Sequence, residues 1–197
     1  MKQKENKTSA ILIDGSNLHA ATLSLGFSID YKRLLDSFGG SLYKAYYFTA
    51  MPPDTEQSTL RPLADYLEFN GFTVVKKLWK EFNHSKTFTC QACNVVNTQH
   101  STKTKGNMDV EIAVRAYEIA PHISELYLFS GDGDFRDLVE SLQRCHGIHV
   151  TVVSTIKTKP MMCADILRRQ ADDFIDLVDM RETVERIEDR RRNLEGK

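Results

Sequence analysis

Acidic side chains follow two apolar stretches of the sequence, at the points where these stretches end. Asp14 comes directly after residues 10–13, and Asp132 and Asp134 come shortly after residues 125–129. Carboxylates at close range repel one another, and a divalent cation removes that repulsion. Mg²⁺ prefers oxygen ligands, and a bound ion of this kind polarises a phosphate oxygen or activates a water. The residue types therefore indicate an acidic metal site suited to phosphodiester hydrolysis.

Each of these acids also has a purely structural explanation. An Asp-Gly pair after a strand is often only a turn, and Asp134 is suited to capping the helix that follows it. Asp109 stands at a predicted helix start, where it compensates the helix dipole. In open parallel sheets, however, ligands bind beyond the carboxyl ends of the strands. We therefore expect Asp14, Asp109, Asp132 and Asp134 to meet there, with Asn17 orienting a water or a carboxylate.

The elements that must position these residues alternate between apolar runs and helical patterns. This alternation predicts an α/β fold with a mainly parallel sheet and helices on both of its faces. The predicted strands and helices are, in order, strands at residues 10–13, 42–48, 72–78, 125–129 and 149–154, and helices at residues 55–70, 107–120, 135–145 and 164–170, followed by a short element at residues 174–178. Cys145 and Cys163 lie in periodic segments and are predicted to be small core residues.

Three motifs make the chain similar to the NYN family of the PIN-like nuclease superfamily, which includes the bacterial LabA-like proteins. They are Ile13-Asp14-Gly15-Ser16-Asn17, Lys105-Gly106-Asn107-Met108-Asp109-Val110-Glu111 and Phe129-Ser130-Gly131-Asp132-Gly133-Asp134-Phe135. The resemblance implies a PIN-like (Rossmann-like) α/β/α domain over residues 9–180 and metal-dependent ribonuclease activity. It also implies that Asp14, Asp109, Asp132 and Asp134 hold Mg²⁺ or Mn²⁺, with Asn17 beside them. We expect RNA to be the substrate and Lys103, Lys105, Ser16 and Arg136 to contact it.

A long polar insert at residues 80–106 lies between the strand predicted at residues 72–78 and the helix predicted at residues 107–120. It contains Cys90 and Cys93, with His84 and His100 on either side. A Cys-x2-Cys pair is half of a zinc site, although the order His, Cys, Cys, His is not a common zinc-finger pattern. We favour no metal in this segment, and a structural Zn²⁺ site formed by these four residues stays open as the alternative. A mobile, solvated loop is the purely structural explanation. The lysines of the insert are suited to RNA phosphates.

The net charge and the two ends of the chain indicate the partners and the location of the protein. A net charge of -1 is mild evidence against a nucleic-acid binder, although a cluster of aspartates offsets lysines elsewhere. Residues 1–7 lack the apolar segment of a signal peptide and no stretch is suited to spanning a bilayer, so we expect a cytoplasmic protein without a membrane partner. Residues 181–197 carry both charge signs and are predicted to form a solvated helix or tail. A homodimer would be the commonest assembly.

Two other functions compete with the nuclease. A phosphatase of the haloacid dehalogenase type also uses aspartates at strand ends and Mg²⁺, but its Asp-x-Asp motif is broken here by Ser16. A non-catalytic RNA-binding or regulatory protein of the LabA-like kind is the stronger alternative.

Overall fold

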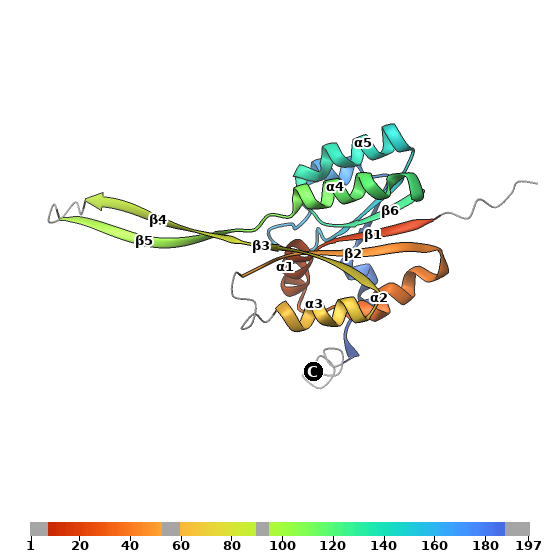
Figure 1. The fold of residues 1–197 in the computed structure, drawn as a ribbon, viewed down its shortest axis with the longest axis horizontal. Coiled ribbons are helices and arrows are strands. Elements are labelled where there is room, and N and C mark those ends of the chain that lie inside the picture. Colours follow the sequence, from red (N-terminus) through yellow and green to blue (C-terminus); the bar gives the residue numbers. More distant parts are fainter. Residues whose placement is uncertain (1–7, 53–59, 90–94, 188–197) are drawn as a thin grey trace, which may run out of the picture.

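Six parallel strands form the central sheet of the computed structural model, which describes residues 8–52, 60–89 and 95–187 (Figure 1). Their order across the sheet is β3-β2-β1-β6-β7-β8. The strands are β1 (Ser9–Asp14), β2 (Leu42–Met51), β3 (Phe72–Leu78), β6 (Glu125–Phe129), β7 (His149–Ser154) and β8 (Asp173–Asp176). Every neighbouring pair is parallel.

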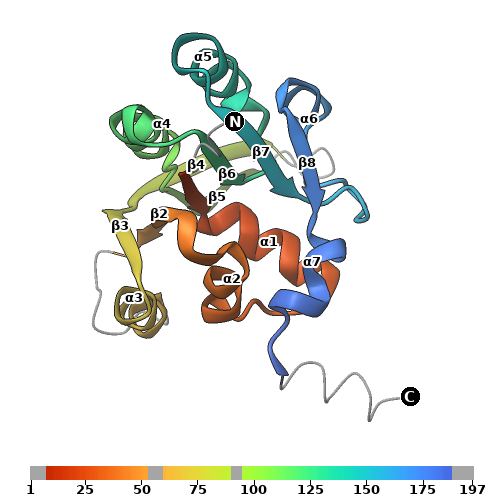
Figure 2. The same ribbon diagram turned by 90° about the vertical axis from the view of Figure 1, so that its right-hand side faces the viewer.

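Helices cover both faces of this sheet, as Figure 2 shows. One face carries α1 (Gly15–Leu25), α2 (Tyr31–Phe38), α3 (Leu60–Phe69) and α7 (Leu177–Val184). The other carries α4 (Asp109–Ile119), α5 (Arg136–His146) and α6 (Asp165–Gln170). The three-layer α/β/α fold with a mainly parallel sheet is therefore confirmed. No helix of the described residues is long and apolar enough to cross a membrane.

Residues 10–13 of β1 are all apolar because the strand is covered on both faces. Ala10 and Leu12 pack into the core beneath α4 and α5, whereas Ile11 and Ile13 pack into the core beneath α1 and α2. All four side chains are fully buried. A parallel strand in this position needs an unbroken apolar run, since successive side chains point to opposite faces.

The order in which the chain adds strands to the sheet reverses between β1 and β6. The connections β1 to β2 and β2 to β3 step outward on one side, and β6, β7 and β8 step outward on the other. Where such connections diverge, a crevice opens beyond the carboxyl ends of the two central strands. Those strands are β1, which ends at Asp14, and β6, which ends at Phe129.

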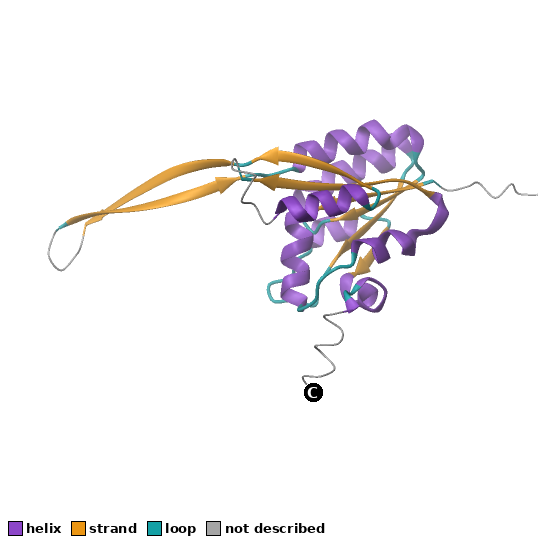
Figure 3. Ribbon diagram, turned by 60° about the horizontal axis from the view of Figure 1, so that its bottom comes forward, coloured by secondary structure: helices purple, strands orange, loops and turns teal. Residues whose placement is uncertain are grey.

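The described part of the polar insert forms a regular pair of strands and not a loop. Strand β4 (Lys80–Thr89) pairs in antiparallel register with β5 (Val96–Lys105). The hairpin extends far beyond the domain, and we call it the arm (Figures 1 and 3). The sequence obscured it because Thr, Ser and Lys dominate both strands, so that they lack the apolar and polar alternation of a strand covered on one face.

Other predicted elements differ from the structure in smaller ways. Helices α1 and α2 have no counterpart among the predicted elements, because α2 is short and α1 has few large apolar residues. The helix predicted at residues 55–70 is described only from Leu60, since residues 53–59 lie outside the described part. Cys163 is buried as predicted, but the prediction for Cys145 was wrong, because this residue is exposed on α5.

Ordered packing continues past Met180, into the segment predicted to be a solvated tail. Val184, at the end of α7, is fully buried in the core between α2 and the sheet. The guanidinium of Arg33 on α2 donates to the carbonyl oxygens of Glu182 and Glu185, at 3.0 and 2.8 Å. Residues 188–197 of the predicted tail lie outside the described residues.

Replacing Val184 by alanine tests whether this segment belongs to the folded domain. We expect Val184→Ala to lower the free energy of unfolding by about 1–3 kcal/mol, because it removes buried methyl groups and leaves a cavity. The matched variant Ile187→Ala changes a side chain that is 55% exposed and should cost less than about 0.5 kcal/mol. Urea unfolding followed by circular dichroism measures both values. Equal effects of the two substitutions would show that residues after Met180 lie outside the core.

Candidate metal centre

Asp14 ends β1 and also begins α1. Its Oδ1 accepts hydrogen bonds from the backbone N–H of Ser16, at 3.2 Å, and of Asn17, at 3.1 Å. The Ser16 hydroxyl donates to the same oxygen at 2.8 Å. An aspartate at this position satisfies backbone donors that the first turn of a helix leaves without partners. The carboxylate is therefore fixed by the fold, and it is 6% exposed.

Ser130 and Asn17 connect the end of β1 to the loop after β6. The Ser130 hydroxyl donates to Oδ2 of Asp14 and accepts from the backbone N–H of Asp132, both at 3.2 Å. Oδ1 of Asn17 accepts from the backbone N–H of Gly131 at 2.9 Å. Two polar contacts, Ser130 with Asp14 and Gly131 with Asn17, thus hold two segments that are more than a hundred residues apart in one arrangement.

Asp132 and Asp109 are positioned by local turns. Oδ1 of Asp132 accepts from the backbone N–H of Asp134 at 3.0 Å, at the start of the short 3-10 helix η3 (Gly133–Phe135). Asn107 makes two contacts with Asp109: its Oδ1 accepts the backbone N–H at 2.8 Å, and its Nδ2 donates to the carboxylate. Asp109 is the first residue of α4.

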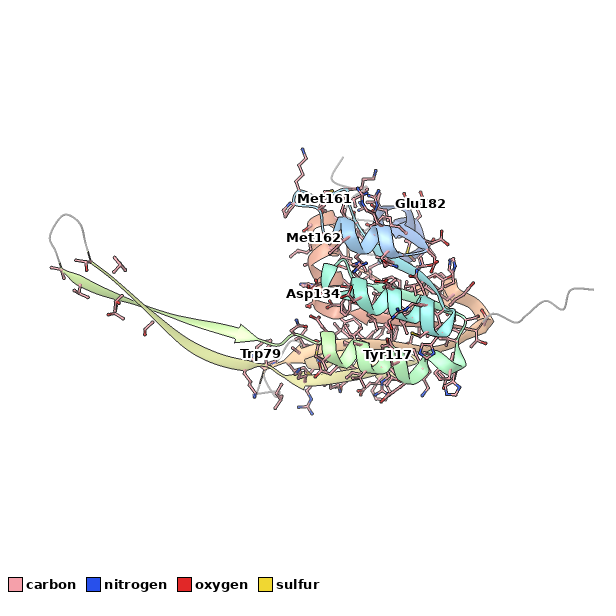
Figure 4. The ribbon with its side chains drawn as sticks, turned by 90° about the horizontal axis from the view of Figure 1, so that it is seen from above. Trp79, Tyr117, Asp134, Met161, Met162 and Glu182 are labelled. Atoms are coloured by element: carbon pink, nitrogen blue, oxygen red, sulfur yellow. The ribbon has the colours of Figure 1, made fainter. Side chains whose placement is uncertain are left out.

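Asp109, Asp132 and Asp134 form a cluster that fits a divalent cation. One carboxylate oxygen from each lies within 4.8 Å of the other two. Ligand oxygens of an octahedral Mg²⁺ are about 3.0 Å apart when adjacent and about 4.2 Å apart when opposite, so the side chains would rotate toward one another around a bound ion. Figure 4 shows Asp134 at the end of the domain from which the arm extends. The donor set, hard carboxylate oxygens alone, suits Mg²⁺ or Mn²⁺.

The ionised form of Asp109 is electrostatically unfavourable in this cluster without a cation. Partial burial raises the pKa of Asp109, and the negative charges of Asp132, Asp14 and Asp134 raise it further. The hydrogen bond from Asn107 acts in the opposite direction. A folded-state pKa above the usual value means that ionised Asp109 destabilises the folded protein at neutral pH. A bound cation would reverse the sign of this effect.

Four of the five predicted catalytic residues, all except Asp134, share one open pocket of about 280 Å³. Its lining consists of Asp14, Ser16, Asn17, Ala20, Asn107, Met108, Asp109, Asp132 and Met162. Asp134 is not part of this lining, although it belongs to the carboxylate cluster. Arg136 is not part of it either, because it forms ion pairs with Asp137 and Glu140 on α5. Asp134 and Arg136 instead line a neighbouring depression beside α4.

The hairpin register places two of the four predicted zinc ligands, His84 and His100. His84 pairs with Ser101 and His100 with Ser85, so the two histidines stand on opposite faces of the ribbon. His84 is also five residues, about 17 Å, from the end of β4 at Thr89. Cys90 and Cys93 lie outside the described residues. The structural Zn²⁺ site of His84, Cys90, Cys93 and His100 therefore stays a prediction.

Lys103 and Lys105 lie on β5, and Lys105 is its last residue, two positions before Asn107. Both lysines are thus close to Asp109 in sequence. Their contact with RNA stays a prediction.

Two polar residues that were not predicted support the centre. Ser130 lies within the motif that carries Asp132, and Asn107 within the motif that carries Asp109, so their presence was visible in the sequence. Their roles were not visible, since each depends on the folded distance to a carboxylate.

Gly131 has no room for a side chain, and this gives a test of the geometry. A Cβ atom there would lie 1.8 Å from the carbonyl oxygen of Met162 and 2.6 Å from Oγ of Ser154. We expect Gly131→Ala to displace the loop that carries Asp132 and to destabilise the protein by about 1–3 kcal/mol.

Gly133→Ala is the matched control, because the nearest atoms, on Ala164 and Ile166, would lie 3.2 Å from its Cβ. Thermal unfolding and Mn²⁺ titration calorimetry should show a large loss for Gly131→Ala and a small change for Gly133→Ala. A Gly131→Ala variant that unfolds and binds Mn²⁺ like the unmodified protein would contradict this loop geometry.

Comparison with known proteins agrees with the fold and the motifs. The chain is 33% identical over 183 residues to the low amplitude and bright protein LabA of Synechococcus elongatus, which covers 91% of this chain and 88% of LabA. Its fold is similar to the crystal structure of a protein of unknown function from Vibrio parahaemolyticus, with a TM-score of 0.67, 24% identity, and coverage of 93% of this chain and 99% of that one. The family model of the NYN domain matches residues 8–179. The chain therefore belongs to the NYN domain family, as its three motifs predicted.

Proposed function

We propose that this protein is a metal-dependent ribonuclease that hydrolyses internal phosphodiester bonds of RNA. The observation that carries the proposal is the cluster of Asp109, Asp132 and Asp134, whose carboxylate oxygens lie within 4.8 Å of one another. The cluster lies where the strand order reverses, the place at which open parallel sheets bind ligands. The NYN domain also belongs to a superfamily of nucleases, which makes RNA the expected substrate.

In this proposal Asp109, Asp132 and Asp134 hold Mg²⁺ or Mn²⁺, and Asp14 faces the same pocket. When bound, the cation supplies charge neutralisation at the phosphate and lowers the pKa of a water. Asp14 has lone pairs left on Oδ2 beyond its contact with Ser130, so it can orient a water or join the coordination. Ser130 and Asn17 keep the carboxylates in place.

Substrate contacts fall to residues around the pocket. Ser16 is exposed at the pocket, and its hydroxyl can accept a hydrogen bond from a ribose while it donates to Asp14. Lys103 and Lys105 supply positive charge for phosphates. Arg136 takes part only if substrate draws it from its ion pairs with Asp137 and Glu140.

The geometry disfavours a phosphatase of the haloacid dehalogenase type. Such an enzyme needs a free nucleophilic carboxylate, and an acid two residues after it. Here Oδ1 of Asp14 accepts three hydrogen bonds, and the residue two positions later is Ser16, which donates one of them. A nucleophile so constrained by its own helix is a poor match for this chemistry.

Cleavage of RNA by an Asp132→Asn variant tests the proposal. We expect Mn²⁺-dependent cutting of a labelled single-stranded RNA by the unmodified protein, and a loss of at least about a hundredfold in the variant, because even outer-sphere changes at metal sites cost about 10–100-fold. Asp65→Asn, an exposed change on α3, is the matched control and should cut normally.

Three results would contradict the nuclease. Equal cutting by all the proteins would point to a contaminating enzyme. Faster turnover of a small phosphate ester than of RNA would favour the phosphatase. RNA binding with no cutting of several RNAs in Mg²⁺ or Mn²⁺ would favour a regulatory RNA-binding protein.

The stability of Asp109→Asn tests the metal site without any turnover. In EDTA at pH 7 we expect this variant to melt at a higher temperature than the unmodified protein, because it removes an ionised carboxylate whose pKa is raised by burial and by neighbouring charges. In millimolar Mn²⁺ the order should reverse, since only the intact cluster gains stability from the bound cation. Differential scanning calorimetry measures the melting temperature of both proteins, each in EDTA and in Mn²⁺. The same order of melting temperatures with and without Mn²⁺ would exclude Asp109 as a ligand.

A further inference from the structure

The arm begins at the edge of the sheet that carries the candidate metal centre. Trp79 links β3 to β4, and its backbone N–H donates to the carbonyl oxygen of Met51 at 2.8 Å, where β2 ends. Gly106 follows β5 and packs so closely that a Cβ there would lie 2.5 Å from Ala50 and 3.0 Å from Cβ of Trp79. Both strands of the arm therefore leave the domain from a fixed base, beside the start of α4.

Lys77 strengthens this base. Its ammonium forms an ion pair of 2.7 Å with Glu111 on α4 and donates to the carbonyl oxygen of Asn107 at 3.3 Å. Asn107 in turn holds Asp109. The base of the arm and the carboxylate cluster are consequently joined through the first turn of α4.

Register and sequence together give the arm two unlike faces. In an antiparallel ribbon, directly opposed residues share a face and successive residues alternate between faces. The face that includes Lys80, which we call the basic face, is made of Lys80, Phe82, His84, Lys86, Phe88, Asn97, Gln99, Ser101, Lys103 and Lys105. The opposite face is made of Glu81, Asn83, Ser85, Thr87, Thr89, Val96, Thr98, His100, Thr102 and Thr104.

Charge and aromatic residues are both segregated to the basic face. All four lysines of the two strands and both of their phenylalanines are on it, and it has no acidic residue. The opposite face has one acidic residue, Glu81, and six Ser or Thr residues. A solvated ribbon needs no such segregation, because lysines on either face would keep it soluble.

The basic face has the composition of a surface that binds single-stranded nucleic acid. Such surfaces combine cationic groups for phosphates with aromatic rings on which bases stack. Phe88 is 50% exposed, although an aromatic ring is costly to leave in water. In the described part of the chain β4 and β5 pair only with each other, and the arm extends away from the helices of the domain (Figure 1).

We propose that the basic face of the arm binds single-stranded RNA, with lysines against phosphates and phenylalanines against bases, and so directs the strand to the carboxylate cluster. The inference rests on the proposed function in that RNA is the partner. It goes further in assigning a binding surface outside the pocket and a preference for unpaired bases. Duplex RNA hides the faces of its bases, so it should bind less tightly.

Two pairs of substitutions with equal change of charge test the role of the lysines. The arm pair is Lys86→Gln with Lys103→Gln, and the control pair is Lys32→Gln with Lys44→Gln, both exposed residues of α2 and β2. Fluorescence anisotropy with a labelled single-stranded RNA in EDTA measures binding without cleavage. We expect the arm pair to weaken binding at least tenfold and the control pair less than twofold. The dependence of log K on log salt should lose about 1.4 in slope, since each phosphate contact to a single strand contributes about 0.7.

Phe88→Ala and Thr87→Ala test stacking with residues that are neighbours in sequence but stand on opposite faces. Loss of one stacked base should weaken binding of single-stranded RNA at least about fivefold in Phe88→Ala. Thr87→Ala, and the binding of duplex RNA by either variant, should change less than twofold.

The outcomes separate this proposal from the nuclease itself. Binding in EDTA needs no turnover, so a protein that never cuts RNA still supports the role of the arm if the arm pair loses affinity. An arm pair that binds RNA as tightly as the control pair overturns the proposal, even if Asp132→Asn has established the nuclease. Sedimentation of the same proteins tests whether a second copy of this chain binds the basic face instead. If the unmodified protein is a dimer, and the arm-pair variant is a monomer with unchanged affinity for RNA, the basic face is a dimer interface.

Discussion

The hydroxyl of Ser130 bridges the two central strands of the sheet at the point where both end. It donates to Asp14 after β1 and accepts from the backbone N–H of Asp132 after β6. Carboxylates repel one another, so a loop that carries two of them would move away from Asp14 unless it were held. The contact between Asn17 and Gly131 restrains the same loop, and the close packing of Gly131 against Met162 leaves it no space in which to relax.

The acidic residues serve the fold and the proposed chemistry at once. Asp14 caps α1 and Asp132 caps η3, so two of the carboxylates satisfy backbone N–H groups at helix starts. A cap fixes a carboxylate within about one rotamer, which is the precision that a metal site needs. The remaining strain appears at Asp109, whose pKa is raised by burial and by the neighbouring charges. A cation would convert this unfavourable interaction into a favourable one.

The sequence allowed the central sheet and the carboxylates to be predicted, because both leave local signals. Buried parallel strands such as β1 and β6 require apolar runs, and the acids that follow them mark one edge of the sheet. The roles of Ser130 and Asn107 were not predictable, since a hydroxyl or an amide becomes specific only through a distance across the fold. The arm was missed for another reason: a ribbon with no core on either side has no apolar face, and only its register reveals that the lysines share a side.

The placement of all four lysines of the arm on one face explains why the net charge says little about the partner of this protein. The chain carries 26 basic and 27 acidic side chains, a balance that suggests no affinity for a polyanion. Yet a polyanion responds to charges within about 8 Å, the screening length at physiological salt, and not to the sum over the molecule. Along the basic face it meets lysines and no acid, and at the base of the arm it meets carboxylates that need a cation. Attraction along the arm and repulsion at the centre, relieved only when metal is bound, would tie productive approach of the strand to occupancy of the site.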